Sequence, residues 1–177
     1  MPFSLAAYRD QLRQFPAITY AEYRDIADDD VRLDIARKNK VISTDTYNRT
    51  MNHIKGPRGR LPEAYTLTFR RSSNGRYLVA NGLRRAVQEA LGPSFTHGEV
   101  DFARDFYAEQ PARGGNGFFD EAMWREVVDH HGGRLPLRVR AVADGTVLLP
   151  GEPVMSVEGP GELAAHLEPL LLRAFYE

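Results

Sequence analysis

The first forty residues place apolar side chains at helical spacing and predict two helices. In the first segment the apolar residues recur every three or four positions, at Leu5, Tyr8, Leu12 and Phe15. Pro16 ends this run, and Thr19 followed by Glu22 is typical of the capping box that begins a helix. The run 28–30, three aspartates, is interpreted as a solvated face or a break between short helices, because three consecutive helical side chains cannot face one metal ion.

The middle of the chain changes from a strand pattern to a helical one. Residues 64–71, with the sequence AYTLTFRR, alternate in a way that favours a β-strand. A helix is predicted from Tyr77 to Leu91, where the apolar side chains share one stripe and Gly92–Pro93 follows. Another helix is predicted over residues 97–109.

The last third of the chain predicts a helix, a β unit and a final helix. Residues 119–131 have helical spacing and are followed by Gly132 and Gly133. The period then changes to two, so residues 136–159 predict a small β unit of short antiparallel strands. Residues 163–175 return to helical spacing, with Pro169 as an interruption or kink. We therefore expect an α+β fold: N-terminal helices, a mixed or antiparallel sheet with packed helices, and the β unit.

Composition narrows the classes of protein that fit. Hydrophobic residues make up 42% of the 177 residues, enough for a core. The net charge of −1 argues against a general nucleic-acid binder, and the absence of cysteine excludes a disulfide scaffold and a thiolate metal site. No stretch is apolar for long enough to span a membrane, and the charged N-terminus does not resemble a signal peptide. A soluble cytoplasmic protein is expected.

Several common chemical motifs are absent. The sequence contains no G-x-G-x-x-G, no P-loop, no H-E-x-x-H and no glycine-flanked serine that stands out as a nucleophile. His130 and His131 are adjacent, so on a helix their rings point apart, whereas a zinc pair prefers a spacing of four. They are interpreted as a solvated helix end.

A local excess of positive charge lies between His53 and Gln88. Glu63 is the only acidic residue in this basic span. Its eight cationic residues are Lys55, Arg58, Arg60, Arg70, Arg71, Arg76, Arg84 and Arg85. Such an excess suits a phosphate-rich ligand, because arginine contacts phosphate oxygens in pairs, but a scattered solvated surface gives the same count.

The tetrapeptide TDTY at residues 44–47 is the strongest local signal. Asp45 could accept a hydrogen bond from an amide N–H, and Tyr47 could stack on a flat ring, with both on one face if the backbone is extended. Alternatively, Thr44 or Asp45 caps a helix and Tyr47 contributes to packing. The residues alone leave both interpretations open.

The order of motifs resembles the N-terminal part of the nicotinamide phosphoribosyltransferases. TDTY is similar to the family's TDSY, and residues 64–71 are similar to the strand ending in arginine that follows it. The stretch 118–159 resembles a helix with a central tryptophan, here Trp124, followed by characteristic turns. The likeness covers about three quarters of the chain, residues 44–177, and the nicotinate-specific relatives share parts of it.

The resemblance implies transfer of a phosphoribosyl group from phosphoribosyl pyrophosphate to the ring nitrogen of nicotinamide or nicotinate. In the family the active site lies at a dimer interface. The barrel of one subunit supplies the Mg²⁺, ribose and pyrophosphate contacts and a histidine that ATP phosphorylates. By motif match Asp45 and Tyr47 would close over the pyridine, and Arg71, or its neighbour Arg70, would lie near the phosphates.

The sequence also departs from the family pattern. The lysine and the histidine that usually follow TDSY are missing, and Asn48 and Met51 fall in this stretch. Residues 1–40 form an extension without a recognised counterpart, so we expect the family's N-terminal domain to occupy 41–177.

The length of the chain leaves its activity open. Because family members are more than twice as long, the catalytic barrel is expected to be absent from this sequence. The chain would then be a fragment or a separately encoded subunit, inactive without a barrel-containing portion, in a homodimer or hetero-oligomer. A nicotinate enzyme, a non-catalytic binding module and an unrelated α+β interaction domain are the alternatives.

Overall fold

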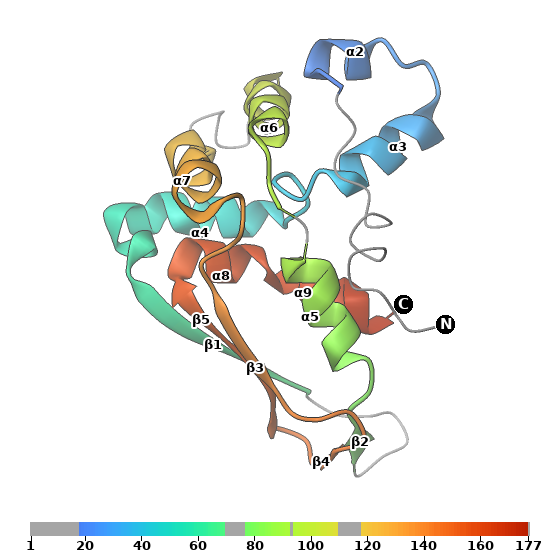
Figure 1. The fold of residues 1–177 in the computed structure, drawn as a ribbon, viewed down its shortest axis with the longest axis vertical. Helices are drawn as coiled ribbons and strands as arrows, with labels where there is room; N and C mark the ends of the chain where they lie inside the picture. The colour runs from blue at the N-terminus through green and yellow to red at the C-terminus, as the bar shows by residue number, and fades with distance from the viewer. Residues whose placement is uncertain (1–17, 70–76, 93, 110–117, 177) are drawn as a thin grey trace. The chain divides into compact units, whose positions relative to one another are not determined.

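The fold is α+β, as expected from the sequence, and its elements are labelled in Figure 1. Within the described part of the chain the strands form two open sheets, and no barrel is present. The computed structural model describes residues 18–69, 77–92, 94–109 and 118–176. The first predicted helix, over residues 3–15, lies outside these ranges.

The chain divides into two compact units, each made of two segments. The helical unit comprises Met1–Ile54 and Leu91–Leu135. The sheet unit comprises Lys55–Ala90 and Pro136–Glu177. The expected boundary at residue 40 stays a prediction.

The helical unit begins with two short helices, each started by a side-chain cap. The capping box predicted at Thr19 is confirmed: Glu22 N–H donates to Thr19 Oγ1 over 3.2 Å, and Thr19 N–H donates to the Glu22 carboxylate over 2.8 Å. Asp28 caps the next helix, so the three aspartates do mark a break between helices. The helices of this unit are α2 (Tyr20–Arg24), α3 (Asp29–Lys38), α4 (Thr46–Lys55), α6 (His97–Glu109) and α7 (Glu121–His131).

Aromatic rings join α2 to α6. The ring of Tyr23 meets that of Phe102 edge to face, with centroids 5.0 Å apart, and Tyr20 meets the same ring at 5.4 Å. The Tyr20 hydroxyl donates to Glu109, which also pairs with Arg24. Each such ring pair contributes about 0.5–1.5 kcal/mol beyond the contribution of the area that it buries. These contacts explain how α2, a helix of five residues, stays packed against α6.

Buried polar groups connect the segment after α3 to the start of α6. Asn39, fully buried, donates from its amide to the Glu99 carbonyl over 3.1 Å and accepts the Val41 N–H over 3.0 Å. The Glu99 carboxylate is also buried and accepts the Thr96 N–H over 2.8 Å, which caps α6. Burial raises the pKa of Glu99 to about 7, although Thr96 and Lys40 oppose that shift.

Helix α7 ends where the sequence predicts it, at two glycines. Gly132 and Gly133 both have positive φ, 58° and 73°, and the Gly133 carbonyl accepts the Phe95 N–H over 2.7 Å. This contact brings Phe95 against Trp124, with ring centroids 4.9 Å apart. Both rings are buried, so the glycine turn positions a large part of the helical unit's core.

The sheet unit is built on the central strand β5. The three-stranded sheet has the order β1-β5-β3 and is antiparallel throughout, and β2 pairs with β4 in a separate two-stranded sheet. The elements of this unit are η1 (Gly56–Arg60), β1 (Pro62–Thr68), β2 (Leu78–Val79), α5 (Leu83–Leu91), β3 (Arg138–Ala141), β4 (Val147–Leu148), β5 (Pro153–Pro160), α8 (Gly161–His166) and α9 (Glu168–Tyr176).

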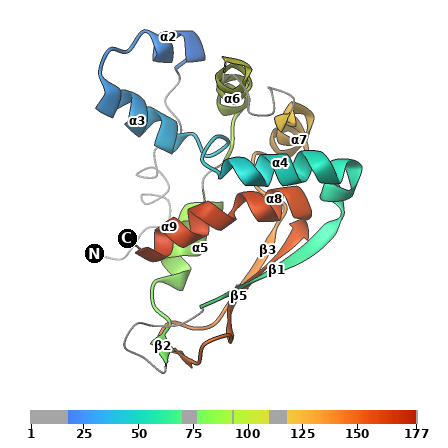
Figure 2. The same ribbon diagram turned by 180° about the vertical axis from the view of Figure 1, so that it is seen from behind.

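One face of the three-stranded sheet is apolar and the other is polar. Tyr65, Val157 and Val139 lie side by side across the three strands on the apolar face. The adjacent row on the other face has Thr66, Ser156 and Arg140. Helix α8 contacts β1 and β5, and Figure 2 shows it beside these strands from behind. This alternation is that of an antiparallel sheet with one solvated face.

Two sequence predictions need correction in this unit. The helix predicted from Tyr77 begins only at Leu83, because Leu78 and Val79 form strand β2 and pair with β4. The strands predicted in 136–159 are present, but β4 belongs to the smaller sheet. The final helix is interrupted at Leu167, as Pro169 suggested, and Pro169 is the second residue of α9.

Replacing Gly133 by alanine is expected to destabilise the protein far more than replacing Gly132. A Cβ at position 133 would lie 2.1 Å from the Phe95 carbonyl oxygen, whereas one at position 132 has no neighbour within 4 Å. Gly132→Ala should cost about 1 kcal/mol for its positive φ, and Gly133→Ala about 3 kcal/mol or more. Urea unfolding of both variants measures the difference, and equal costs would contradict this account.

The buried Glu99 is expected to make stability fall with rising pH. Its pKa is about 7 in the folded chain and near 4.5 when exposed, so the folded state holds the proton more tightly. The free energy of unfolding should drop by up to about 3 kcal/mol between pH 4.5 and 7 and level off above. Glu99→Gln should remove this slope.

The control for that experiment is Glu126→Gln, which removes an exposed carboxylate from α7. Urea unfolding at pH 5 and pH 8 gives the slope for each protein. A Glu99→Gln variant with the same pH dependence as the wild-type chain would show that the buried carboxylate does not carry it.

Candidate functional site

The TDTY segment lies at the start of helix α4 in the helical unit. The helix begins at Thr46, and the Asn48 N–H donates to the Asp45 carbonyl over 3.1 Å, which closes the first turn. The extended arrangement considered from the sequence is therefore wrong, since Tyr47 is the second residue of a helix. The Asp45 and Tyr47 side chains are exposed, and Tyr47 has 46% of its surface accessible.

Tyr47 starts an apolar stripe along the exposed face of α4. Met51 and Ile54 follow at spacings of four and three residues, and each is more than two-fifths exposed. Contiguous exposed apolar side chains of this kind are typical of binding surfaces. A flat ring could therefore stack on Tyr47, and an apolar surface of another segment could pack on Met51 and Ile54.

The side of α4 that carries Asn48 and Arg49 is packed rather than exposed. Asn48 is 1% exposed and donates to the Thr44 hydroxyl over 3.3 Å. The Arg49 guanidinium lies 3.8 Å from the centre of the Tyr107 ring, and burial raises the pKa of Tyr107 to about 12. Neither Asn48 nor Arg49 therefore presents a cation at the position of the family's lysine.

The described members of the basic span lie on different elements and have different partners. Lys55 donates to both oxygens of Glu63, over 2.9 and 2.7 Å, and to the Tyr65 hydroxyl over 3.0 Å. These bonds raise the pKa of Lys55 and lower that of Glu63, so Lys55 belongs to a structural network. Arg85 pairs with Glu89.

Arg60, at the end of η1, also has an interaction partner, and the other five cations fall into two groups. Arg58 on η1 and Arg84 on α5 are exposed and have no ion pair within the described residues. Arg70, Arg71 and Arg76 lie outside those residues, so the assignment of Arg71 or Arg70 to the phosphates stays a prediction.

The glutamate of the Lys55 network is held by a close backbone approach. A Cβ at Gly161, the first residue of α8, would lie 2.5 Å from the Glu63 carboxyl carbon, so a larger residue there would displace the Glu63 side chain. The Gly161 N–H also donates to the Leu61 carbonyl over 3.0 Å. The network thus fixes the start of α8 against β1.

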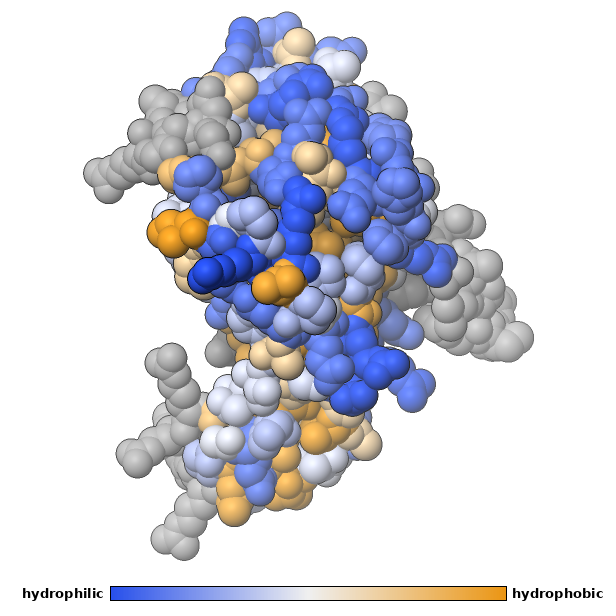
Figure 3. Space-filling model, turned by 90° about the vertical axis from the view of Figure 1, so that its left-hand side faces the viewer, coloured by the Kyte–Doolittle hydropathy of each residue, from blue (hydrophilic) through white to orange (hydrophobic). Residues whose placement is uncertain are grey.

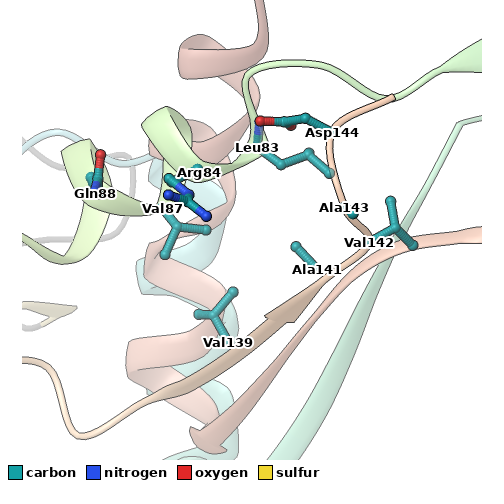
Figure 4. A pocket seen from close by; sticks show the side chains of 9 residues that line it. All are labelled: Leu83, Arg84, Val87, Gln88, Val139, Ala141, Val142, Ala143 and Asp144. Carbon is teal, nitrogen blue, oxygen red and sulfur yellow. The ribbon is translucent and has the colours of Figure 1, made fainter. Parts of the chain in front are cut away.

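A cavity of about 560 Å³ lies between α5 and β3 in the sheet unit (Figure 4). It is lined by Leu83, Arg84, Val87, Gln88, Val139, Ala141, Val142, Ala143 and Asp144. The sequence interpretation missed this cavity, although it counted Arg84 in the basic span. Its walls come from segments more than fifty residues apart, and no local pattern indicates that they meet.

The smaller sheet exposes an apolar face. Val79 lies opposite Val147, and Tyr77 and Leu149 continue the same face at the ends of the two strands. All four side chains are at least half exposed. Hydrophobic surface gathers at the corresponding end of the molecule in Figure 3. This face is a second exposed apolar area besides the stripe on α4, and its four side chains do not indicate a particular ligand.

The described residues include neither a cluster of metal-binding side chains nor a helix that could span a membrane. No three histidine, aspartate or glutamate side chains there lie close enough together to hold an ion. His130 and His131 are exposed at the end of α7, as the sequence indicates. No helix in the described part of the chain has the length and hydrophobicity to cross a bilayer.

Residues 39–139 match the family model described as "Nicotinamide phosphoribosyltransferase, N-terminal domain". The chain is 36% identical over 99 residues to a nicotinamide phosphoribosyltransferase of Xanthomonas campestris pv. campestris (strain 8004). That alignment covers 54% of this chain and 20% of the relative. A crystal structure of human nicotinic acid phosphoribosyltransferase matches with a TM-score of 0.56 and 27% identity, over 75% of this chain and 25% of the human one. The chain thus spans about a fifth to a quarter of the length of these relatives.

Proposed function

Because this chain belongs to the nicotinamide phosphoribosyltransferase family through its N-terminal domain, we propose that it forms part of an enzyme that makes nicotinamide mononucleotide. The reaction joins nicotinamide to phosphoribosyl pyrophosphate and releases pyrophosphate. This chain contributes the surface that closes over the pyridine. The groups that hold Mg²⁺, ribose and pyrophosphate, and any histidine phosphorylated by ATP, come from a barrel-containing portion or partner.

The exposed start of α4 is the observation that carries this proposal. The Tyr47 ring is accessible to a flat pyridine, and stacking of such rings contributes about 0.5–1.5 kcal/mol beyond the area buried. Asp45, exposed immediately before the helix, can accept a hydrogen bond from the carboxamide N–H. The matched family region contains both residues.

Of these two residues, Asp45 is the one that would discriminate between the two candidate bases. Nicotinamide is neutral and offers the N–H that a carboxylate accepts, whereas nicotinate would bring a second negative charge beside Asp45. The match to a human nicotinic acid enzyme supports nicotinate as the second candidate. Both bases therefore belong in the assay.

The enzyme proposal is tested on the assembly that forms around this chain in its own cells. The assembly is isolated through a tag on the chain and supplied with Mg²⁺, phosphoribosyl pyrophosphate and either labelled base. Formation of the mononucleotide is expected, with nicotinamide preferred. An assembly that transfers the phosphoribosyl group to neither base would overturn the proposal and favour a non-catalytic binding module.

In that assembly, Tyr47→Ala is expected to raise the KM for the base about tenfold, because it removes the stacking surface. Tyr47→Phe keeps the ring and should leave the KM within about twofold. Tyr77→Ala is the matched control, since it removes another exposed tyrosine, next to β2. An unchanged KM in Tyr47→Ala would remove Tyr47 from the base site.

A further inference from the structure

Strand β3 has a free edge. It pairs with β5 on one side and is the last strand of the three-stranded sheet. The Val142 N–H donates to the Val154 carbonyl over 3.0 Å, and these residues continue the register of the two strands. Hydrogen-bonded and non-hydrogen-bonded pairs alternate along an antiparallel ladder. Because Val142 bonds to β5, the backbone groups of Arg140 also face β5, and those of Val139 and Ala141 face away from it. No hydrogen bond to these outward groups occurs among the described residues.

The cavity described above lies along this free edge. Val139 and Ala141 line it from the strand, and Val87 and Leu83 line it from α5, as Figure 4 shows. The turn that follows β3 closes one end and is held in place because Asp144 accepts the Leu83 N–H over 3.0 Å. The outward backbone groups and the apolar space therefore adjoin one another, which is the arrangement that an added strand requires.

Two arginines lie near this cleft, and the acidic Asp144 lies at its closed end, where it caps α5. Arg84 lines the cavity from α5, and Arg138 lies on the polar face of β3. Both are exposed, and neither has an ion pair within the described residues. The neighbouring Arg140 pairs with Glu158 over 2.7 Å. A strand that lies beside β3 would place the side chains of its polar face next to Arg138, so acidic residues are favoured there.

We propose that the cleft between α5 and β3 binds an extended segment of a second polypeptide, which adds to the sheet as a fourth strand. Its backbone hydrogen-bonds to Val139 and Ala141. Its side chains alternate between apolar residues, which fill the cavity, and acidic residues, which lie beside Arg138. The segments 70–76 and 110–117 of this chain do not fit, since they contain no valine, leucine, isoleucine or aromatic residue. This proposal is independent of the role assigned to Tyr47.

The probe is a seven-residue peptide with blocked ends and the sequence TVEVEVT, titrated into the chain up to about 1 mM. Amide hydrogen exchange is followed by NMR. Saturation should slow exchange at Val139 and Ala141 at least tenfold, while the Arg140 amide, already bonded to β5, should change little. The peptide TVKVKVT should bind at least tenfold more weakly. Absence of binding, or binding without protection of Val139 and Ala141, would overturn the proposal.

Two variants distinguish addition of the peptide to β3 from binding of the peptide at another part of the surface. Ala141→Pro removes an outward N–H without breaking the ladder to β5 and should weaken binding of TVEVEVT at least tenfold. Ala64→Pro is the matched control, on the opposite edge strand β1. The Gly161 N–H donates to the Leu61 carbonyl, so the backbone groups of every second residue after Leu61 face β5. The backbone N–H of Ala64 therefore faces away from β5. This variant should bind as the wild-type chain does. Equal loss in both variants would contradict the site.

A charge exchange completes the test. Arg138→Glu should reverse the order of the two peptides, so that TVKVKVT binds more tightly than TVEVEVT. The polar position of Arg138 makes loss of folding unexpected, and the amide spectrum checks it. A variant that folds and still prefers the acidic peptide would remove Arg138 from the site.

Discussion

The pairing of β5 with a neighbour on each side is the constraint on which the sheet unit depends. Alternate residues of this strand bond to β1 and to β3, and the side chains follow the same period of two. A shift by one residue would turn Val157 and Met155 outward and bring the row containing Arg140 inward. The register thus determines which side chains face the helices and leaves the outer groups of β3 available to another strand.

The helical unit depends on hydrogen bonds that offset the cost of burying polar side chains. Asn39 and Glu99 are buried, and their bonds hold the segment after α3 against the start of α6. Burial makes the charged form of Glu99 less stable, and the Thr96 cap offsets only part of that cost. The same network supports α6, whose aromatic side chains in turn hold α2. Removal of one buried group would therefore affect several helices.

The proposed base site at the start of α4 rests on membership of the nicotinamide phosphoribosyltransferase family. By itself the α4 stripe of Tyr47, Met51 and Ile54 is only an accessible apolar surface. A base that stacks there needs a partner surface, because one exposed ring cannot exclude water from a pyridine. Under the proposed function that partner surface belongs to a barrel-containing portion.

Features that depend on a few neighbouring residues could be predicted. The capping box at Thr19, the break at Asp28, the limits of α6 and the glycine end of α7 all follow from side chains within one or two turns. The TDTY motif could be found for the same reason, although its helical conformation was one of two possibilities. The helix predicted from Tyr77 began too early, because Leu78 pairs with Leu148, seventy residues away.

The sequence by itself therefore determined most of the local elements, the fold class and the family, because each family motif spans only neighbouring residues. Only the tertiary structure decided the order β1-β5-β3, the outward face of β3 and the cavity beside α5. These features arise where distant segments meet, as when Asp144 caps the helix that begins at Leu83. Hydrophobic periodicity records which face of an element is buried, but it does not record which other element buries it.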